Sequence, residues 1–383
     1  MRILHTSDWH LGRSFHREPL LAAQRVFLED LINVVQRERV DAVAVAGDVY
    51  DRAIPPLEAI DLFQHTLAKL AELNVPLVMI SGNHDSPRRL GVNSRLIEHA
   101  GIHLRTDPRD LARPVLLNDA HGPVAFYGLP YLEPALVRER LDAPATSHQA
   151  VLGTAMDRVR EDLATRPGTR AVVLAHAFVT GAEPSASERD ITVGGVANVP
   201  AALFDGMDYV ALGHLHRSQR ISDRVRYSGS PLPYSFTEAG HPKSMWLVDL
   251  DGDGAMTARA IPCPEPYHLA HLQGELDDLL TRDQYTNLEQ AWLHVTLTDT
   301  SRSHMAMERL RQRFPRVLKL THAATGPCAD DLPSRERMES LTDHEIALEF
   351  LHHVTQADAT EPERDLLRRG IEHVRVTAQG ETL

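Results

Sequence analysis

Short apolar runs alternate with stretches of helical periodicity over the first 260 residues. Six runs are apolar enough for buried strands, at 2–6, 41–46, 76–81, 124–128, 170–175 and 207–212. Apolar residues recur at three- and four-residue spacing over roughly 19–38, 57–73 and 148–165, which predicts helices. The alternation of strand and helix predicts a layered α/β domain with a largely buried sheet.

A change of pattern near residue 263 predicts a domain boundary. Runs at 244–250 and 256–261 form a predicted hairpin around the turn of Asp251, Gly252, Asp253 and Gly254. The regular pattern then ends at a segment with two prolines, Cys263, Pro264, Glu265 and Pro266. The first domain is therefore expected to cover 1–265. Residues 266–330 are expected to form a small α/β unit, with strands at 291–298 and 316–321 and a helix near 302–313.

The last segment, 331–383, predicts two helices in a polar context. Thr342 with Glu345 and Thr360 with Glu363 fit the capping box, in which side chains satisfy free N–H groups at a helix start. The apolar residues that follow are Ile346, Ala347, Phe350, Leu351 and Val354, then Leu366, Leu367, Gly370, Ile371 and Val374. Two helices of this size are seldom stable alone. Their apolar faces therefore need to pack against a partner protein or against the chain's own second domain.

Five polar clusters each follow a predicted strand in the first domain. They are Asp8 and His10; Gly47 and Asp48; Gly82, Asn83, His84 and Asp85; His176; and Gly213, His214 and His216. An open α/β sheet places its binding crevice outside the carboxyl ends of its strands, so residues far apart in sequence can meet there.

Carboxylate, imidazole and amide groups are suitable ligands for manganese, iron, zinc or magnesium. Asp8 and His10 are two residues apart, as are His214 and His216, so an extended segment would point each pair to one side. Asp48 could bridge two ions. Each cluster alone has an ordinary explanation, as a turn dipeptide or a buried imidazole; all five in order indicate a metal centre.

In this order the clusters resemble the signature of the calcineurin-like metallophosphoesterases. Within that superfamily the flanking segments resemble the SbcD-type nuclease subunits of bacteria, at 1–12, 46–52, 81–86, 209–216 and 227–231, followed by Ser235 and Phe236. The resemblance is strong over residues 1–260 and weaker over the C-terminal third. It implies a layered metallophosphoesterase β-sandwich flanked by helices, with a small α/β capping domain at 266–330 that contacts DNA.

The resemblance also implies roles for single residues. One metal would be held by Asp8, His10, Asp48 and His216, and the other by Asp48, Asn83, His176 and His214. His84 would face the phosphate and protonate the leaving oxygen, with Asp85 orienting it. Some relatives carry histidine three positions after the bridging aspartate; here that residue is Asp51. The implied metal is manganese.

The implied activity is hydrolysis of DNA phosphodiester bonds. The family members act as ATP-dependent double-strand exonucleases and as single-strand or hairpin endonucleases in DNA repair, recombination and replication. Their partner is an SbcC-type ATPase, bound through the C-terminal helical pair in a heterotetramer of two each. A homodimer through the nuclease domain is also implied, with candidate helices at 57–73 and 88–99 carrying Leu62, Phe63, Leu67, Leu70, Leu90, Leu96 and Ile97.

Composition limits these expectations. The 383 residues favour more than one domain, and the formal charge of −13 argues against a lone sequence-specific DNA binder. Bound metals and a partner subunit could supply positive charge to a nuclease. Two cysteines, Cys263 and Cys328, are too few for a disulfide framework. Without a membrane-length apolar run or a signal peptide, a cytoplasmic location is expected.

Two other classes of protein remain open from the sequence. A different two-metal phosphoesterase, such as a protein phosphatase or a cyclic-nucleotide phosphodiesterase, would share every ligand but would not need the segments after residue 266. A non-catalytic interaction module could keep the fold, but it has no physical reason to keep the complete ligand set. Hydrolysis of duplex DNA compared with a small phosphodiester would separate these possibilities.

Overall fold

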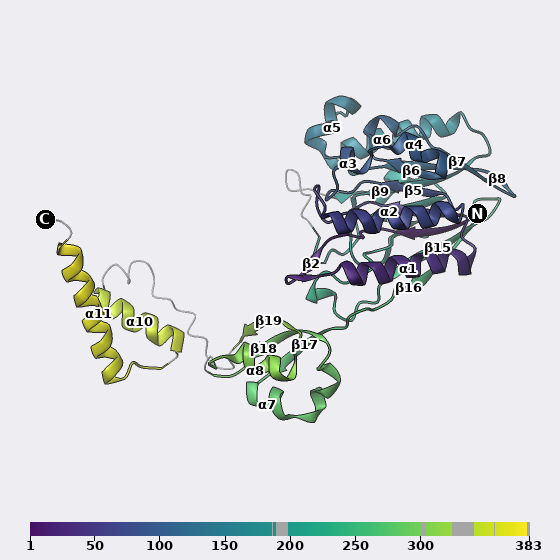
Figure 1. Cartoon of the computed structure of the whole chain (residues 1–383). Coiled ribbons are helices and arrows are strands. Elements are labelled where there is room, and N and C mark those ends of the chain that lie inside the picture. The colour runs from purple at the N-terminus through teal and green to yellow at the C-terminus, as the bar shows by residue number, and fades with distance from the viewer. Residues whose placement is uncertain (186, 189–197, 301–302, 324–340, 356, 381–383) are drawn as a thin grey trace. The chain divides into compact units, whose positions relative to one another are not determined.

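The computed structural model describes all residues except 186, 189–197, 301–302, 324–340, 356 and 381–383, so Cys328 lies outside the described residues. The chain divides into two compact units, Met1–Leu269 and Ala270–Leu383 (Figure 1). Among the described residues, no helix has both the length and the apolar character needed to cross a membrane.

The first unit contains two six-stranded sheets. In spatial order, the first consists of β16 (Met256–Pro262), β15 (Ser244–Leu250), β1 (Arg2–Thr6), β4 (Ala42–Ala46), β5 (Leu77–Ile80) and β6 (Ile102–Arg105). Its four strands from β1 to β6 are parallel, with Ile3 opposite Ala42, and β15 joins β1 antiparallel. The strands predicted at 2–6, 41–46 and 76–81 are therefore neighbours in one sheet.

The second sheet also has four parallel strands, which lie at its centre. It consists of β13 (Gln219–Arg220), β14 (Val225–Tyr227), β12 (Tyr209–Gly213), β9 (Arg170–His176), β8 (Gly122–Leu129) and β7 (Val115–Asp119). β8, β9, β12 and β14 are parallel, and the two edge strands are antiparallel to their neighbours. β9 and β12, which carry histidines at their carboxyl ends, lie side by side.

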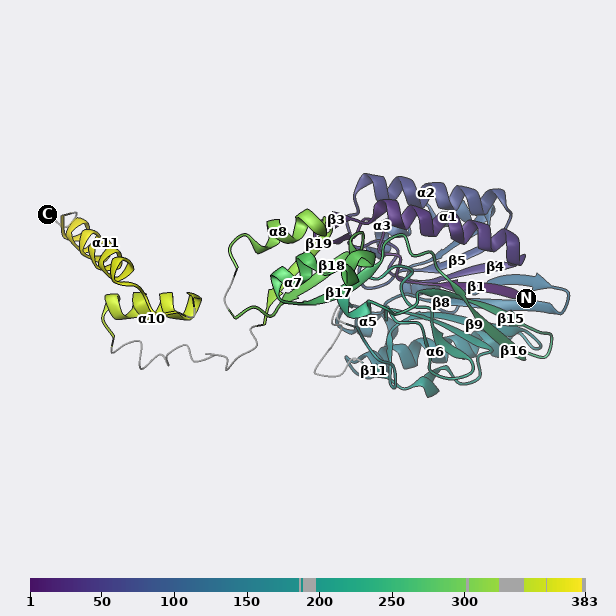
Figure 2. The ribbon, with the colours of Figure 1, turned by 90° about the horizontal axis from the view of Figure 1, so that it is seen from below.

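The two sheets pack face to face with helices on the outer sides (Figure 2). A buried cluster that includes Ile3, Val78, Phe126 and Tyr209 fills the space between the sheets. The helices α1 (Leu21–Glu38) and α2 (Leu57–Glu72) cover the first sheet, and α5 (Pro134–Leu141) and α6 (His148–Ala164) cover the second. The predicted layered α/β sandwich flanked by helices is confirmed.

The expected continuous helix over 88–99 is wrong. The segment instead forms two short turns of helix, α3 (Pro87–Leu90) and α4 (Ser94–Ile97). Asn93 has a left-handed backbone, with φ of 61°, and this conformation cannot continue a right-handed helix. Of the apolar residues expected in a dimer interface, Leu62, Phe63, Leu70 and Leu90 are buried in the core of the unit, while Leu96 is exposed.

The second unit contains a three-stranded sheet of β17 (Leu269–Gly274), β18 (Trp292–Leu297) and β19 (Val317–His322). The helices α7 (Leu276–Thr281) and α8 (Ala306–Arg313) share a buried cluster with it around Leu293 and Phe314. The last helices are α10 (Asp343–Thr355) and α11 (Glu361–Gly380). The Thr342 and Thr360 N–H groups donate to Glu345 and Glu363 at 2.7 and 2.8 Å, and the Glu345 N–H returns a bond to the Thr342 hydroxyl at 3.3 Å, which completes the first predicted capping box.

Candidate metal centre

All five predicted polar clusters lie at the carboxyl ends of central strands. The loop after β1 carries Asp8 and His10, and the loop after β4 carries Asp48. The backbone N–H groups of Asp8 and His10 donate to the carbonyl oxygens of Gly47 and Asp48, both at 3.0 Å. The extended backbone expected for Asp8 and His10 is wrong: both are left-handed, with φ of 55° and 45°, so a tight turn brings them to the site.

Glycines allow the loops to approach this closely. A Cβ atom on Gly213 would lie 1.9 Å from the carbonyl oxygen of Ala46, and one on Gly82 would lie 2.1 Å from Asp48 Oδ1. Any larger residue would push the two sheets or the two loops apart. Gly47 has a φ of 92°, a conformation that side chains other than glycine rarely adopt.

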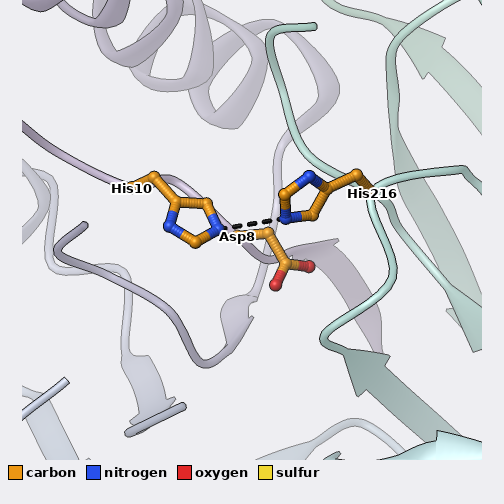
Figure 3. A group of neighbouring side chains, drawn as sticks. All are labelled: Asp8, His10 and His216. Atoms are coloured by element: carbon orange, nitrogen blue, oxygen red, sulfur yellow. Dashed lines mark hydrogen bonds between the residues drawn. The ribbon is translucent and has the colours of Figure 1, made fainter. Parts of the chain in front are cut away.

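The structure brings most of the expected ligands together. Three overlapping groups have side-chain donor atoms within 4.8 Å of one another: Asp8, His10 and His216; His10, Asp48 and His84; and Asp8, Asp48 and His176. Figure 3 shows the first group, with the rings of His10 and His216 facing each other beside the Asp8 carboxylate. All of these side chains except His84 are buried.

Asp48 lies between the two halves of the site. Its Oδ2 atom is 3.7 Å from His10 Nε2 and 3.5 Å from His176 Nε2. On the side of His176, Asn83 Oδ1 lies 2.9 Å from His176 Nε2 and 3.2 Å from His214 Nδ1. The Nδ2 atom of Asn83 is buried without a hydrogen-bond partner among the described residues, so the amide uses its oxygen in the site.

The outer nitrogens of the imidazoles fix where the protons lie. His176 Nδ1 is 2.8 Å from the carbonyl oxygen of Ala46, and a carbonyl only accepts, so Nδ1 carries a proton. The Nε2 atom of the neutral ring then presents a lone pair to the oxygen of Asn83. Two lone pairs in contact at a buried site require a cation or a proton between them.

The other half of the site also brings two imidazole nitrogens into contact. His10 Nδ1 faces Asp51 Oδ1 at 3.6 Å, and His216 Nδ1 lies 2.5 Å from Ser187 Oγ. Their Nε2 atoms are 3.1 Å apart and point at each other. Buried lone pairs from imidazole, carboxylate and amide groups thus converge, which fits a divalent metal bound by nitrogen and oxygen ligands.

Charge favours a cation at this position. Burial raises the pKa of Asp8 to about 6. Burial alone would also raise the pKa of Asp48, but His176 and His10 lower it well below its usual value. Burial lowers the pKa of His176, and Asp48 and Asp8 more than compensate, raising it to about 9. The negative potential that favours a proton on His176 also favours a divalent metal, which would displace that proton.

His84 lies at the edge of the centre and is half-buried. Its Nδ1 donates to the carbonyl oxygen of Asp51 at 2.8 Å, and its backbone N–H donates to Asp48 Oδ1 at 2.9 Å. Its Nε2 is therefore the nitrogen left for the site. The Asp85 carboxylate accepts from the N–H groups of Val49, Tyr50 and Gly82, so it joins the loops after β4 and β5.

Several residues around the centre were not expected from the sequence. Tyr234 packs edge-on against both His10 and His216, with ring centroids at 5.3 and 5.5 Å, and the Arg13 guanidinium lies over its ring, 4.8 Å from the centroid. Arg13 also pairs with Asp51 at 3.4 Å. On the far side of His216 lie Ser187, Glu188, Glu238 and Lys243. Ser187, Glu188 and Lys243 lie in loops and Glu238 ends the short 3-10 helix Phe236–Glu238, where no apolar periodicity identifies them.

Comparison with known proteins agrees with this geometry. A family model described as calcineurin-like phosphoesterase matches residues 1–218, and the chain belongs to this family. A second model, for the SbcD C-terminal domain and described as the type 5 capsule protein repressor C-terminal domain, matches residues 266–355. The two matches together are consistent with an SbcD-type chain.

Two solved structures are similar to this chain at low identity. A protein from Thermus thermophilus is 14% identical, with a TM-score of 0.39, over 68% of this chain and 98% of the other. A dimetal phosphatase from Danio rerio is 16% identical, with a TM-score of 0.42, over 68% of this chain and 95% of the other.

Proposed function

We propose that the chain is the nuclease subunit of an SbcCD-type complex and hydrolyses DNA phosphodiester bonds with two manganese ions. In this role it is an ATP-dependent double-strand exonuclease and a single-strand or hairpin endonuclease in DNA repair, recombination and replication. One observation carries the proposal: the metallophosphoesterase centre and the SbcD C-terminal match occur in the same chain. A general phosphatase would need only the first.

The proposed ligands divide between two metals that share Asp48. The first would be held by Asp8, His10, Asp48 and His216, and the second by Asp48, Asn83, His176 and His214. When bound, two such ions lower the pKa of an attacking water and neutralise the phosphate oxygens. The position of Asp48 between His10 and His176, at 3.7 and 3.5 Å, supports its role as the shared ligand.

His84 is the proposed general acid. Its Nδ1 is occupied by the carbonyl oxygen of Asp51, which aims the ring and leaves Nε2 to hold a proton. A proton at Nε2 can pass to the departing sugar oxygen, which then leaves as a neutral alcohol. Arg13, close to the site and held by Asp51 and Tyr234, adds a positive charge on this side.

The second unit divides, in this proposal, into a capping domain over 266–330 that contacts DNA and a helical pair over 331–383 that binds the ATPase. On β18 and β19, the face opposite the core carries His294, Thr296, Lys319 and Thr321, which are polar or basic groups suited to phosphate and sugar contacts. The sequence contains no phosphate-binding loop of the Gly-x-x-x-x-Gly-Lys-Ser/Thr type, so ATP use requires the partner.

The helical pair leaves large apolar side chains in solvent. Phe350 on α10 and Leu366 and Val374 on α11 are each 65% exposed. An SbcC-type ATPase that covers them would bury this surface. In the first unit Leu57, Val92 and Leu96, which lie on the candidate segments 57–73 and 88–99, are exposed and so are available for the proposed dimer. A monomer in sedimentation at micromolar concentration would count against that dimer.

The deciding experiment compares substrates for the purified full chain. The chain with manganese is given linear duplex DNA, single-stranded DNA or a small phosphodiester, with and without EDTA, the ATPase partner and ATP. We expect metal-dependent cleavage of DNA, and ATP stimulation of duplex degradation only when the partner is present. Cleavage of the small diester with no action on any DNA, even with the partner, would show a different phosphoesterase.

A further inference from the structure

A chain of buried polar groups holds His216 from the side away from the metal centre. Ser187 Oγ lies 2.5 Å from His216 Nδ1 and 2.5 Å from Glu238 Oε1. Glu238 is 1% exposed, and its other oxygen accepts a hydrogen bond from the Lys243 ammonium. The loop that carries His216 is thus connected through a hydroxyl to a buried carboxylate from another segment.

The hydrogen-bond roles in this chain follow from the chemistry of its members. A carboxylate only accepts, so the Ser187 hydroxyl donates its single proton to Glu238. The Ser187 oxygen must then accept from His216, which places a proton on Nδ1 of the ring. The Nε2 atom of His216 keeps its lone pair and lies 3.1 Å from His10 Nε2, inside the candidate centre.

The backbone around His216 is fixed by the same neighbours. The His216 N–H donates to Glu188 Oε1 at 2.8 Å, and the His216 carbonyl oxygen accepts from Lys243 at 2.8 Å. Glu188 and Ser187 are adjacent, so one short segment hydrogen-bonds to both the ring and the backbone of His216. Glu238 also forms an ion pair with the Lys243 ammonium, which stabilises the charged carboxylate.

We infer that Ser187 and Glu238 are positioning residues for His216, which set its tautomer and strengthen metal binding at its Nε2 atom. A carboxylate behind a metal-binding histidine makes the ring a better ligand and fixes its direction. Here the carboxylate acts through a serine hydroxyl. The inference rests on the proposed function, in which His216 is a metal ligand.

Manganese binding to the full chain tests this directly, through competition with a fluorescent chelator after removal of bound metal. We expect Ser187→Ala and Glu238→Gln to weaken binding at one of the two sites by roughly 10- to 100-fold. Ser187→Thr, which keeps a hydroxyl, should restore most of the affinity. Thr237→Ala is the matched control, because its hydroxyl donates to Ser235 on the same turn as Glu238 and lies outside the chain that reaches His216.

His216→Ala separates failure of the inference from failure of the proposed centre. If His216→Ala loses a site while folded Ser187→Ala binds manganese as the wild type does, the inference is wrong and the centre stands. If His216→Ala itself binds two ions normally, both are overturned. In the metal-free chain, nitrogen NMR of His216 should show a proton on Nδ1. Ser187→Ala should lower the population of that tautomer. The comparison of wild type with Ser187→Ala tests the inference even if Glu238→Gln does not fold.

Discussion

The Nε2 atoms of His10 and His216 lie 3.1 Å apart in a buried site, and the other nitrogen of each ring faces an oxygen atom. Two neutral imidazoles arranged this way would repel each other unless a cation or a proton lies between them. The pair comes from loops after β1 and β12, which belong to different sheets. The fold therefore uses close packing of two sheets to assemble a site that neither sheet could form alone.

His84 should be needed for hydrolysis but not for metal binding. We expect His84→Ala to retain two metals per chain and to lose roughly 10²–10⁴-fold in the rate of DNA cleavage, the usual contribution of a general acid. Elemental analysis and the nuclease rate are measured on the same sample. His65→Ala, at an exposed histidine of α2, is the control. Loss of metal from His84→Ala would mean that His84 is a ligand, as its place near His10 and Asp48 permits.

Gly213 should be intolerant of any side chain. We expect Gly213→Ala to lower the free energy of unfolding by about 3 kcal/mol and to impair metal binding, since its Cβ would lie 1.9 Å from the Ala46 carbonyl oxygen. Denaturant unfolding measures the first effect. Gly153→Ala is the control: its position in α6 has room, with Leu203 at 3.7 Å, and alanine favours helix. Equal stability of the two variants would contradict this account.

Sequence patterns predicted the fold and the site unequally. Strands β1, β4 and β5 were predicted from continuous apolar runs, and helices α1 and α2 from apolar residues at three- and four-residue spacing. Both signals lie within the segment itself. The helix over 88–99 was wrong because Asn93 adopts a left-handed backbone that apolar spacing does not reveal. The contacts of Ser187 and Glu238 with His216 could not be predicted, because two loops and a short 3-10 helix meet only through the tertiary fold.

The exposed apolar residues of α10 and α11 should mediate partner binding. We expect Phe350→Asp and Leu366→Asp to weaken binding to the ATPase by at least tenfold and to leave manganese-dependent cleavage of single-stranded DNA unchanged. Deletion of residues 338–383 should have the same effect. Leu136→Asp on α5 is the control, because Leu136 is 72% exposed and lies in the other unit. If Phe350→Asp and Leu366→Asp bind the ATPase with unchanged affinity in a co-purification titration, these residues do not mediate partner binding.

The ion pair between Asp119 and Arg170 should stabilise the first unit at neutral pH. Arg170 binds both Asp119 oxygens, at 2.5 and 3.1 Å, and these bonds, with the N-terminal ammonium, lower the pKa of Asp119. A depressed carboxylate pKa adds stability above the unfolded value, about 3.9, and this stability is lost as pH falls through the folded value. Asp119→Asn should therefore cost roughly 1–3 kcal/mol at pH 7, and less in acid.

Unfolding by denaturant between pH 7 and pH 2 measures this difference, because the stability is lost only below the unfolded pKa of about 3.9. The control is Asp157→Asn, whose carboxylate is 72% exposed and pairs with Arg160 at 3.1 Å. An exposed pair of this kind contributes at most about 1 kcal/mol, so the control should change stability little at any pH. A loss in Asp119→Asn that stays constant from pH 7 down to pH 2 would contradict the assignment.

The metal content of Asp48→Ala tests the central claim most directly, because the proposed two-metal centre depends on one shared carboxylate. Elemental analysis of the full chain after saturation with manganese and removal of free metal gives the number of ions bound. We expect two ions per chain for the wild type and fewer than one for Asp48→Ala, with DNA cleavage abolished. Two ions bound by a folded Asp48→Ala protein, or none bound by the wild type, would contradict the claim.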